Sequence, residues 1–163
     1  MKQTFEKTVE SYFRYSAVMS NAHYDMAEKY RKRYRLFGII VVTVTSIVGT
    51  TVFTSLGESP DTRIQLFTGL LSIGAAVLSA LQTFLGFSEL QAQHKRAGDG
   101  YSISRRDFEF LMMKYPTANG ITGESGTSEL EALKKNLDEL DRASPTIPDK
   151  IYDAAVAKTP VQK

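Results

Sequence analysis

The chain has 163 residues, a formal net charge of +2 and a slightly polar mean hydropathy, which together fit one domain of ordinary size. It contains no cysteine, so disulfide bonds and thiolate chemistry are excluded, and its two histidines offer little for a transition-metal site. These totals conceal an uneven distribution. The apolar residues concentrate in two blocks and the basic residues cluster beside them, so the blocks rather than the averages define the class of protein.

The first 35 residues are polar and charged, which is not typical of a cleaved signal peptide. No glycine precedes Gly38 and no proline precedes Pro60, so nothing interrupts a helix in this region. Apolar or aromatic residues recur at helical spacing. They are Phe5, Val9, Tyr12, Met19, Met26 and Tyr30. We expect an amphipathic helix that starts near Thr4 and runs directly into the first apolar block.

Two apolar blocks, residues 36–56 and 66–87, contain no charged side chain over 21 and 22 residues. A helix of that length reaches about 31 Å, which matches a hydrocarbon core of about 30 Å. A core helix of a soluble bundle normally meets water on one face, so we favour two transmembrane helices over that alternative. The segment 57–65 is too short for a domain, and either Asp61 or Thr62 can cap the second helix. An antiparallel hairpin follows.

The basic residues on either side of the blocks predict the orientation. A dense group of basic anchors precedes the first span. Its members are Lys29, Arg31, Lys32, Arg33 and Arg35. Lys95 and Arg96 follow the second span, whereas the connecting loop has only Arg63. Basic loops stay in the cytoplasm, so both termini are predicted to lie on the cytoplasmic side of the membrane. Tyr30 and Tyr34 suit the headgroup layer, and we favour this reading over a nucleic-acid patch.

The second span carries a stripe of small or hydroxyl residues at spacings of three and four. Its members are Gly69, Ser72, Ala76, Ser79, Thr83 and Gly86. Small residues let helices approach closely in lipid, so this stripe packs either the hairpin alone or neighbouring chains as well. Gln82 is the only amide in either block, and we expect it to hydrogen-bond between helices rather than to act in a pore.

The first span is rich in hydroxyl side chains, which bond back to their own helix and are therefore tolerated in lipid. Some of them share one face. These candidate pore-lining residues are Thr43, Ser46, Thr50 and Thr54. Because two helices cannot enclose a pathway, lining a lumen requires a homo-oligomer. Glu58 and Asp61 at the outer mouth favour the alternative of a regulated ion channel.

Residues 88–163 are predicted to form cytoplasmic helices that complete a bundle. The second span should continue through residues 89–97 until Gly98 and Gly100 interrupt it, and a helix should resume over 101–115. Residues 116–127 are expected to form a loop. Ser128 and Glu131 then fit a capping box ahead of a leucine face, which docks on the bundle or on a partner. The leucines are Leu130, Leu133, Leu137 and Leu140. A last short helix spans 149–158.

No catalytic constellation is present: the sequence lacks a phosphate-binding loop, paired histidines at metal spacing and a nucleophile elbow. We therefore expect neither an enzyme nor a bound cofactor or metal. His94 follows the second span among cationic residues, and we interpret it as a bundle or interface residue rather than as a ligand or pH sensor. The predicted fold is an all-α membrane protein, a two-transmembrane helical hairpin whose long helices extend into a cytoplasmic helical bundle.

This layout resembles the SLATT family of two-transmembrane effector domains. The resemblance covers nearly the whole chain: the basic YRKRYR run, the hairpin, the post-span stretch SELQAQHKRAGDGYSISRRDFE and the terminal ASPTIPDKIYDAA. The more particular positions are Glu89, His94, Ala97, Tyr101 and Arg105, together with the segment Ser144–Pro148.

The resemblance implies an effector of bacterial antiphage defence that forms membrane pores in response to a nucleotide second messenger. It supplies no catalytic residues. Many relatives are fused to sensor or enzyme domains, whereas we expect this chain to be the bare module. Either a separate sensor protein signals to it or its bundle binds the nucleotide, in which case Arg105 and Arg106 can meet a phosphate, although inner-leaflet anchoring is the simpler role. A regulated ion channel without a lethal role and a non-conducting membrane scaffold remain alternatives.

Overall fold

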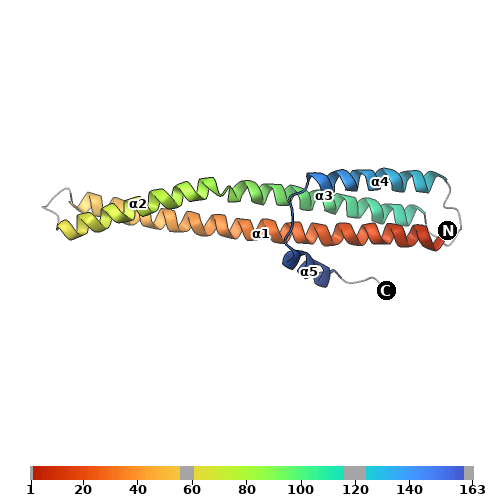
Figure 1. Cartoon of the computed structure of the whole chain (residues 1–163), viewed down its shortest axis with the longest axis horizontal. Coiled ribbons are helices and arrows are strands. Elements are labelled where there is room, and N and C mark those ends of the chain that lie inside the picture. The colour runs from red at the N-terminus through yellow and green to blue at the C-terminus, as the bar shows by residue number, and fades with distance from the viewer. Residues whose placement is uncertain (1, 56–60, 116–123, 160–163) are drawn as a thin grey trace. The chain divides into compact units, whose positions relative to one another are not determined.

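The computed structural model describes residues 2–55, 61–115 and 124–159, and the side chains of 5–52, 61–115 and 125–159. All regular structure within these ranges is helical. The elements are α1 (Lys2–Ser55), α2 (Thr62–Phe84), α3 (Phe87–Lys114), α4 (Glu124–Ala143) and α5 (Asp149–Lys158) (Figure 1). The chain divides into two compact units, and α1 contributes to both. We call residues 29–90 the hairpin and residues 1–28 with 91–163 the bundle, and describe each by itself.

The core of the bundle lies where the first part of α1 meets α3 and α4, which run side by side in Figure 1. Tyr101, Phe108 and Leu111 of α3 are buried against Val9 of α1 and Leu137 of α4. Tyr101, Phe108 and Leu111 are spaced by seven and three residues, which places them on one face of α3. The prediction of an amphipathic helix continuous with the first span is confirmed, because α1 has no interruption between Lys2 and Ser55.

Two glycines of α3 lie in the helix interior, so the predicted interruption at Gly98 and Gly100 is wrong. A Cβ atom at Gly98 would lie 3.1 Å from ring atoms of Tyr24, and one at Gly100 would lie 2.8 Å from Cδ1 of Leu140. The glycines therefore permit α1 and α4 to approach α3 closely. Close packing between helices, rather than an interruption of α3, explains why glycine occupies both positions.

Helix α4 begins at Glu124, so the predicted loop up to residue 127 and the capping box at Ser128 are wrong. The remainder of that loop, 116–123, lies outside the described residues. Gly126 is buried in the first turn of α4, where a Cβ atom would lie 3.6 Å from the ring of Tyr115. The leucine face packs into the core, which confirms docking within the bundle. That face is therefore not available to a partner, and a scaffold acting through it loses support.

Helix α5 packs on α1 through a separate small cluster. Ala155 is fully buried against Val18 and Ala22 of α1, with Ile151 and Val156 beside it. The ion pair between Lys158 Nζ and Asp25 Oδ2, at 2.6 Å, adds a contact at the surface. The predicted last helix, 149–158, is confirmed.

The hairpin consists of the second part of α1 and α2. Asp61 caps α2 by accepting a hydrogen bond from the backbone N–H of Arg63 at 2.9 Å. Of the two predicted capping residues, Asp61 and Thr62, it is therefore Asp61 that caps the helix. The rest of the predicted outer loop, 57–60, lies outside the described residues. Helix α2 ends at Phe84, three residues before the predicted end of the span, because Gly86 adopts a φ of 54° that favours glycine.

Candidate functional site

The hairpin exposes large apolar side chains along both helices. They include Leu36, Ile39, Val42, Ile47 and Val52 of α1, and Leu66, Phe67, Leu70, Ile73, Val77, Leu81 and Phe84 of α2. The described chain has two helices long and apolar enough to cross a membrane, within Phe5–Val52 and Thr62–Lys114. The most apolar stretch of the first helix is 0% buried, and that of the second is 6% buried. Core helices of a soluble bundle would be mostly buried, and water-soluble monomers rarely expose contiguous apolar patches of this size.

The candidate pore-lining hydroxyls lie on an exposed side of α1. Thr43, Ser46 and Thr50 each donate a hydrogen bond to the carbonyl oxygen four residues earlier, at 2.8, 2.8 and 2.9 Å. The side chain of Thr54 lies outside the described residues. The less exposed face of this part of α1 is formed by other residues. They are Phe37, Val41, Val44, Val48 and Thr51. The hydroxyl face is therefore turned away from the side that packs within the hairpin.

On α2, the residues that pack within the hairpin differ from the predicted stripe. The less exposed positions are Thr68, Leu71, Ala75, Leu78 and Gln82, of which Ala75 is 5% exposed. Each exposed stripe residue follows a residue of this face by one position, so the stripe lies roughly 100° around the helix from it. Five stripe residues are exposed in the single chain, and Gly86 is half-buried. The exposed ones are Gly69, Ser72, Ala76, Ser79 and Thr83.

Gln82 belongs to the intrahairpin face. A Cβ atom at Gly38 of α1 would lie 3.8 Å from Nε2 of Gln82, so the amide lies against the other helix of the hairpin. The basic anchors Lys29, Arg31, Lys32, Arg33 and Arg35 are all exposed on α1. Phe87 lies next to this basic stretch, with its ring centroid 6.2 Å from that of Tyr30 and 5.7 Å from that of Phe37. An aromatic cluster thus accompanies the basic run.

His23 of α1 and His94 of α3 form a buried pair in the bundle. Their Nδ1 atoms lie 3.0 Å apart, and their exposed fractions are 0% and 2%. One ring donates and the other accepts at this contact, so the accepting ring is neutral. The ring of His23 also stacks on that of Tyr101, with 5.3 Å between centroids. Among the described residues, Nε2 of His23 has no hydrogen-bond partner, and no group of three acidic or histidine ligands forms a metal site.

The surroundings of the pair favour neutral imidazoles. Burial and the neighbouring His94 lower the pKa of His23 from 6.5 to about 4, and burial lowers the pKa of His94 too. The interpretation of His94 as a bundle residue is confirmed, but its contact with His23 was not predicted. The sequence does indicate that His23 is buried, because it lies four residues after Met19 and three before Met26, on the apolar face of the expected helix.

A second polar contact joins all three helices of the core. Asp141 of α4 accepts hydrogen bonds from the phenol groups of Tyr101, at 2.5 Å, and Tyr15, at 3.1 Å. Burial and this carboxylate raise the pKa of both phenols. The two rings meet edge to face, with centroids 6.4 Å apart. One carboxylate therefore fixes the register of α1, α3 and α4 at the same level of the bundle.

We expect the bundle to lose stability as the pH falls from 6.5 towards 4. In that window the unfolded chain binds a proton at His23 while the folded bundle keeps that ring neutral. The free energy of unfolding therefore falls with pH, by up to ~1.4 kcal/mol per pH unit from His23, and the lowered pKa of His94 acts in the same direction. Thermal unfolding of the full chain in a neutral detergent, followed by circular dichroism from about pH 7.5 to 5, measures this slope.

The matched control replaces the pair with apolar side chains, as His23→Phe with His94→Leu, which removes both titrating groups together. The pH dependence above about pH 5, where most carboxyl groups are still ionised, should then flatten. An unchanged slope in this double variant would show that other groups are responsible.

The fold and the exposed surface of the hairpin define the class: an all-α chain with two helices long and apolar enough to cross a membrane. No family model matches the chain, and no curated protein or solved structure was found to be similar to it.

Proposed function

We propose that the chain is one subunit of a homo-oligomeric membrane pore, inserted in a bacterial inner membrane as a two-helix hairpin with both termini in the cytoplasm. One observation carries the proposal: the stripe of small residues on α2 is exposed in the single chain, while the hairpin packs through the face of Ala75. In lipid, such a face favours close packing against another helix. A second copy of the hairpin offers the matching surface.

The hydroxyl face of α1 supports the same arrangement. Thr43, Ser46 and Thr50 are exposed on the side away from the intrahairpin contact, so in a ring of hairpins they can face the axis. Their hydroxyls are satisfied within the helix, so such a lining is weakly polar and needs no fixed partner. The basic anchors before the span favour the cytoplasmic side for the bundle.

The resemblance to the SLATT family extends the proposal to a biological role. In that role, the pore depolarises or permeabilises the membrane of a phage-infected cell when a nucleotide second messenger or a separate sensor protein activates it. A regulated channel without a lethal role shares the same hairpin and differs only in the consequence of opening.

The test combines a purified and a cellular measurement. The full chain reconstituted in liposomes at high protein density should release a small trapped ion and cross-link into species larger than a dimer. Expression in a bacterial host should lower the signal of a potential-sensitive dye before the cells lose viability. Protein that inserts and cross-links but leaves liposomes sealed and the membrane potential intact would contradict a pore. Depolarisation without loss of viability would favour the regulated channel.

A further inference from the structure

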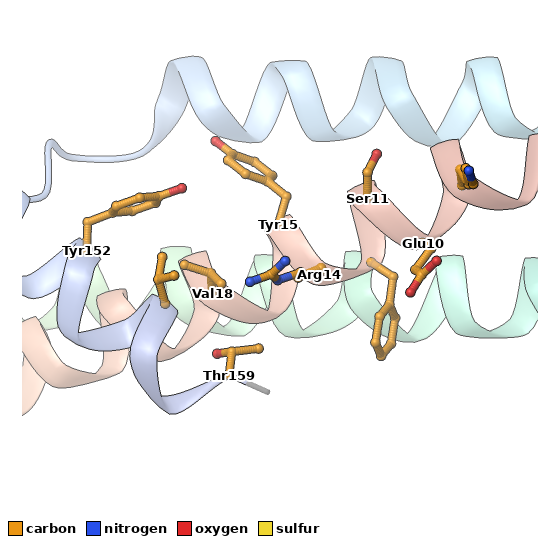
Figure 2. Close-up of a pocket in the computed structure, with 10 residues that line it drawn as sticks. Glu10, Ser11, Arg14, Tyr15, Val18, Tyr152 and Thr159 are labelled. Atoms are coloured by element: carbon orange, nitrogen blue, oxygen red, sulfur yellow. The ribbon is translucent and has the colours of Figure 1, made fainter. Parts of the chain in front are cut away.

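A groove with a volume of 560 Å³ lies between α1 and α5 on the surface of the bundle. Figure 2 shows Arg14 between Val18 and Glu10 on α1, with Tyr152 contributed by α5 and Thr159 by the C-cap that follows it. The α1 side runs from Lys7 to Val18, a length of about 16 Å along the helix. The groove is therefore elongated, and its volume falls in the range of pockets that hold small ligands.

The groove carries an excess of positive charge. Lys7 and Arg14 line it on one face of α1, seven residues apart, and Glu10 is the single acidic residue of the lining. Arg14 is half-buried, and neither it nor Lys7 has an ion-pair partner among the described residues. A guanidinium group in this setting favours a carboxylate or phosphate, which it can bind with two parallel hydrogen bonds.

The two aliphatic hydroxyl groups of the lining are already engaged. The hydroxyl of Ser11 donates to the carbonyl oxygen of Thr8, and that of Thr159 donates to the carbonyl oxygen of Ala155. Thr159 also accepts a hydrogen bond from the side-chain amide of Asn21 at 3.2 Å. The two cations are therefore the groups best placed to bind a polar ligand atom.

The other end of the groove is apolar. Val18 of α1 is 3% exposed and lies beside Val156 of α5, while Tyr152 also lines the groove and is 39% exposed. Along α1 the lining thus changes from charged at Lys7 and Arg14 to apolar at Val18. A ligand complementary to both ends has an anionic head and an apolar tail.

We propose that this groove binds a single-chain anionic amphiphile, with a carboxylate or phosphate head on Arg14 and Lys7 and an acyl chain on Val18, Val156 and Tyr152. The site goes beyond the proposed pore and does not depend on it. Because α5 forms one wall, an occupied groove adds contacts that hold α5 on α1. Binding of the amphiphile should therefore be visible as slower opening of α5.

The experiment measures backbone hydrogen exchange of α5 in the full chain, held in nanodiscs of neutral phosphatidylcholine. The probes are octanoate and octyl phosphate, which present the two head groups on one chain. Octyl glucoside supplies the same chain without charge, and inorganic phosphate supplies the charge without a chain. Octanoate or octyl phosphate, or both, should protect Asp149–Lys158 with a saturable dose dependence, and the response to each identifies the preferred head group.

Two variants that change the charge of the groove in opposite directions extend the test. Arg14→Gln should raise the half-saturating concentration by about tenfold or more, because it removes a charge-assisted hydrogen bond. Glu10→Gln should lower it by roughly two- to fivefold, because it removes a repulsive charge. Arg142→Gln, on an exposed arginine of α4 outside the groove, makes the same charge change as Arg14→Gln and should have no effect.

Several results would overturn the proposal. Equal protection by octyl glucoside would reduce the groove to an apolar surface, and equal protection by inorganic phosphate would reduce it to a simple anion site. Unchanged half-saturation in Arg14→Gln would show that the head lies elsewhere. None of these results depends on ion flux, so they leave the proposed pore to its own test.

Discussion

Replacing Ala76 with leucine is expected to abolish most ion flux through reconstituted liposomes. Ala76 lies in the exposed stripe of small residues on α2, and a larger side chain there separates helices that would otherwise approach closely. A loss of about 1.4 kcal/mol lowers the association constant between neighbouring chains tenfold, and the flux should fall with it. Cross-linking should show a parallel shift from oligomers to monomers. Leucine is at least as apolar as alanine, so insertion into the membrane should be unaffected.

The matched control is Val77→Leu, which enlarges the neighbouring residue. Val77 is 53% exposed and lies outside the stripe, on a side of α2 that we assign to lipid. Its replacement should leave both flux and cross-linking near the wild-type values. Loss of flux in the Val77 variant together with retention in the Ala76 variant would assign the wrong face of α2 to the contact between chains.

Replacing Leu137 with alanine should destabilise the bundle by about 2–5 kcal/mol, the usual cost of a cavity left by a buried leucine. Leu137 of α4 is 2% exposed and packs in the core with Val9, Tyr101 and Phe108. The measurement is thermal unfolding of the full chain in detergent, followed by circular dichroism. The hairpin should remain helical in detergent, so the first loss of signal reports the bundle.

Asn136→Ala provides the comparison, because Asn136 is the exposed neighbour of Leu137 on the same helix. A surface substitution of this kind should change the free energy of unfolding by less than about 0.5 kcal/mol. Equal stability of the two variants would mean that α4 does not contribute to the core as described. A large loss in the Leu137 variant with normal liposome flux would show that conduction does not require a stable bundle.

The continuous α1 was predictable because local sequence governs helix continuity. Glycine and proline are absent before Gly38, and the apolar positions keep their spacing up to Tyr30. The two apolar blocks were equally clear, since charge-free runs of that length have few other uses. Helix α5 was bounded correctly because Pro148 stands at its N-cap.

Several of the errors concern glycines, whose role the local sequence does not reveal. Gly98 and Gly100 were predicted to interrupt the helix, but α3 continues across both positions. Glycine is needed there because Tyr24 and Leu140 fill the space that a side chain would take. Gly86 was predicted to be a packing residue, but it lies at the break between α2 and α3 and has a positive φ. The sequence pattern cannot tell a glycine that bends the chain from one that admits a neighbour.

The polar contacts of the bundle were beyond sequence reasoning for a similar reason. His23 and His94 are 71 residues apart, and Asp141 is 126 residues from Tyr15. Each meets its partner only through the packing of α1 against α3 and α4. Hydrophobic periodicity places a residue on a face but does not give the register between two helices, and the register decides which polar groups meet.

The tyrosines that share Asp141 also give the bundle an optical signal of its own. The chain has no tryptophan, so tyrosine dominates its near-ultraviolet absorption. Because the pKa values of Tyr15 and Tyr101 are raised above 10, these phenols should stay protonated in the folded bundle after exposed tyrosines have ionised. Unfolding releases them to ionise, and the bundle should lose stability as the pH rises above 10. Tyrosinate absorbance at alkaline pH can therefore report opening of this core without any attached dye.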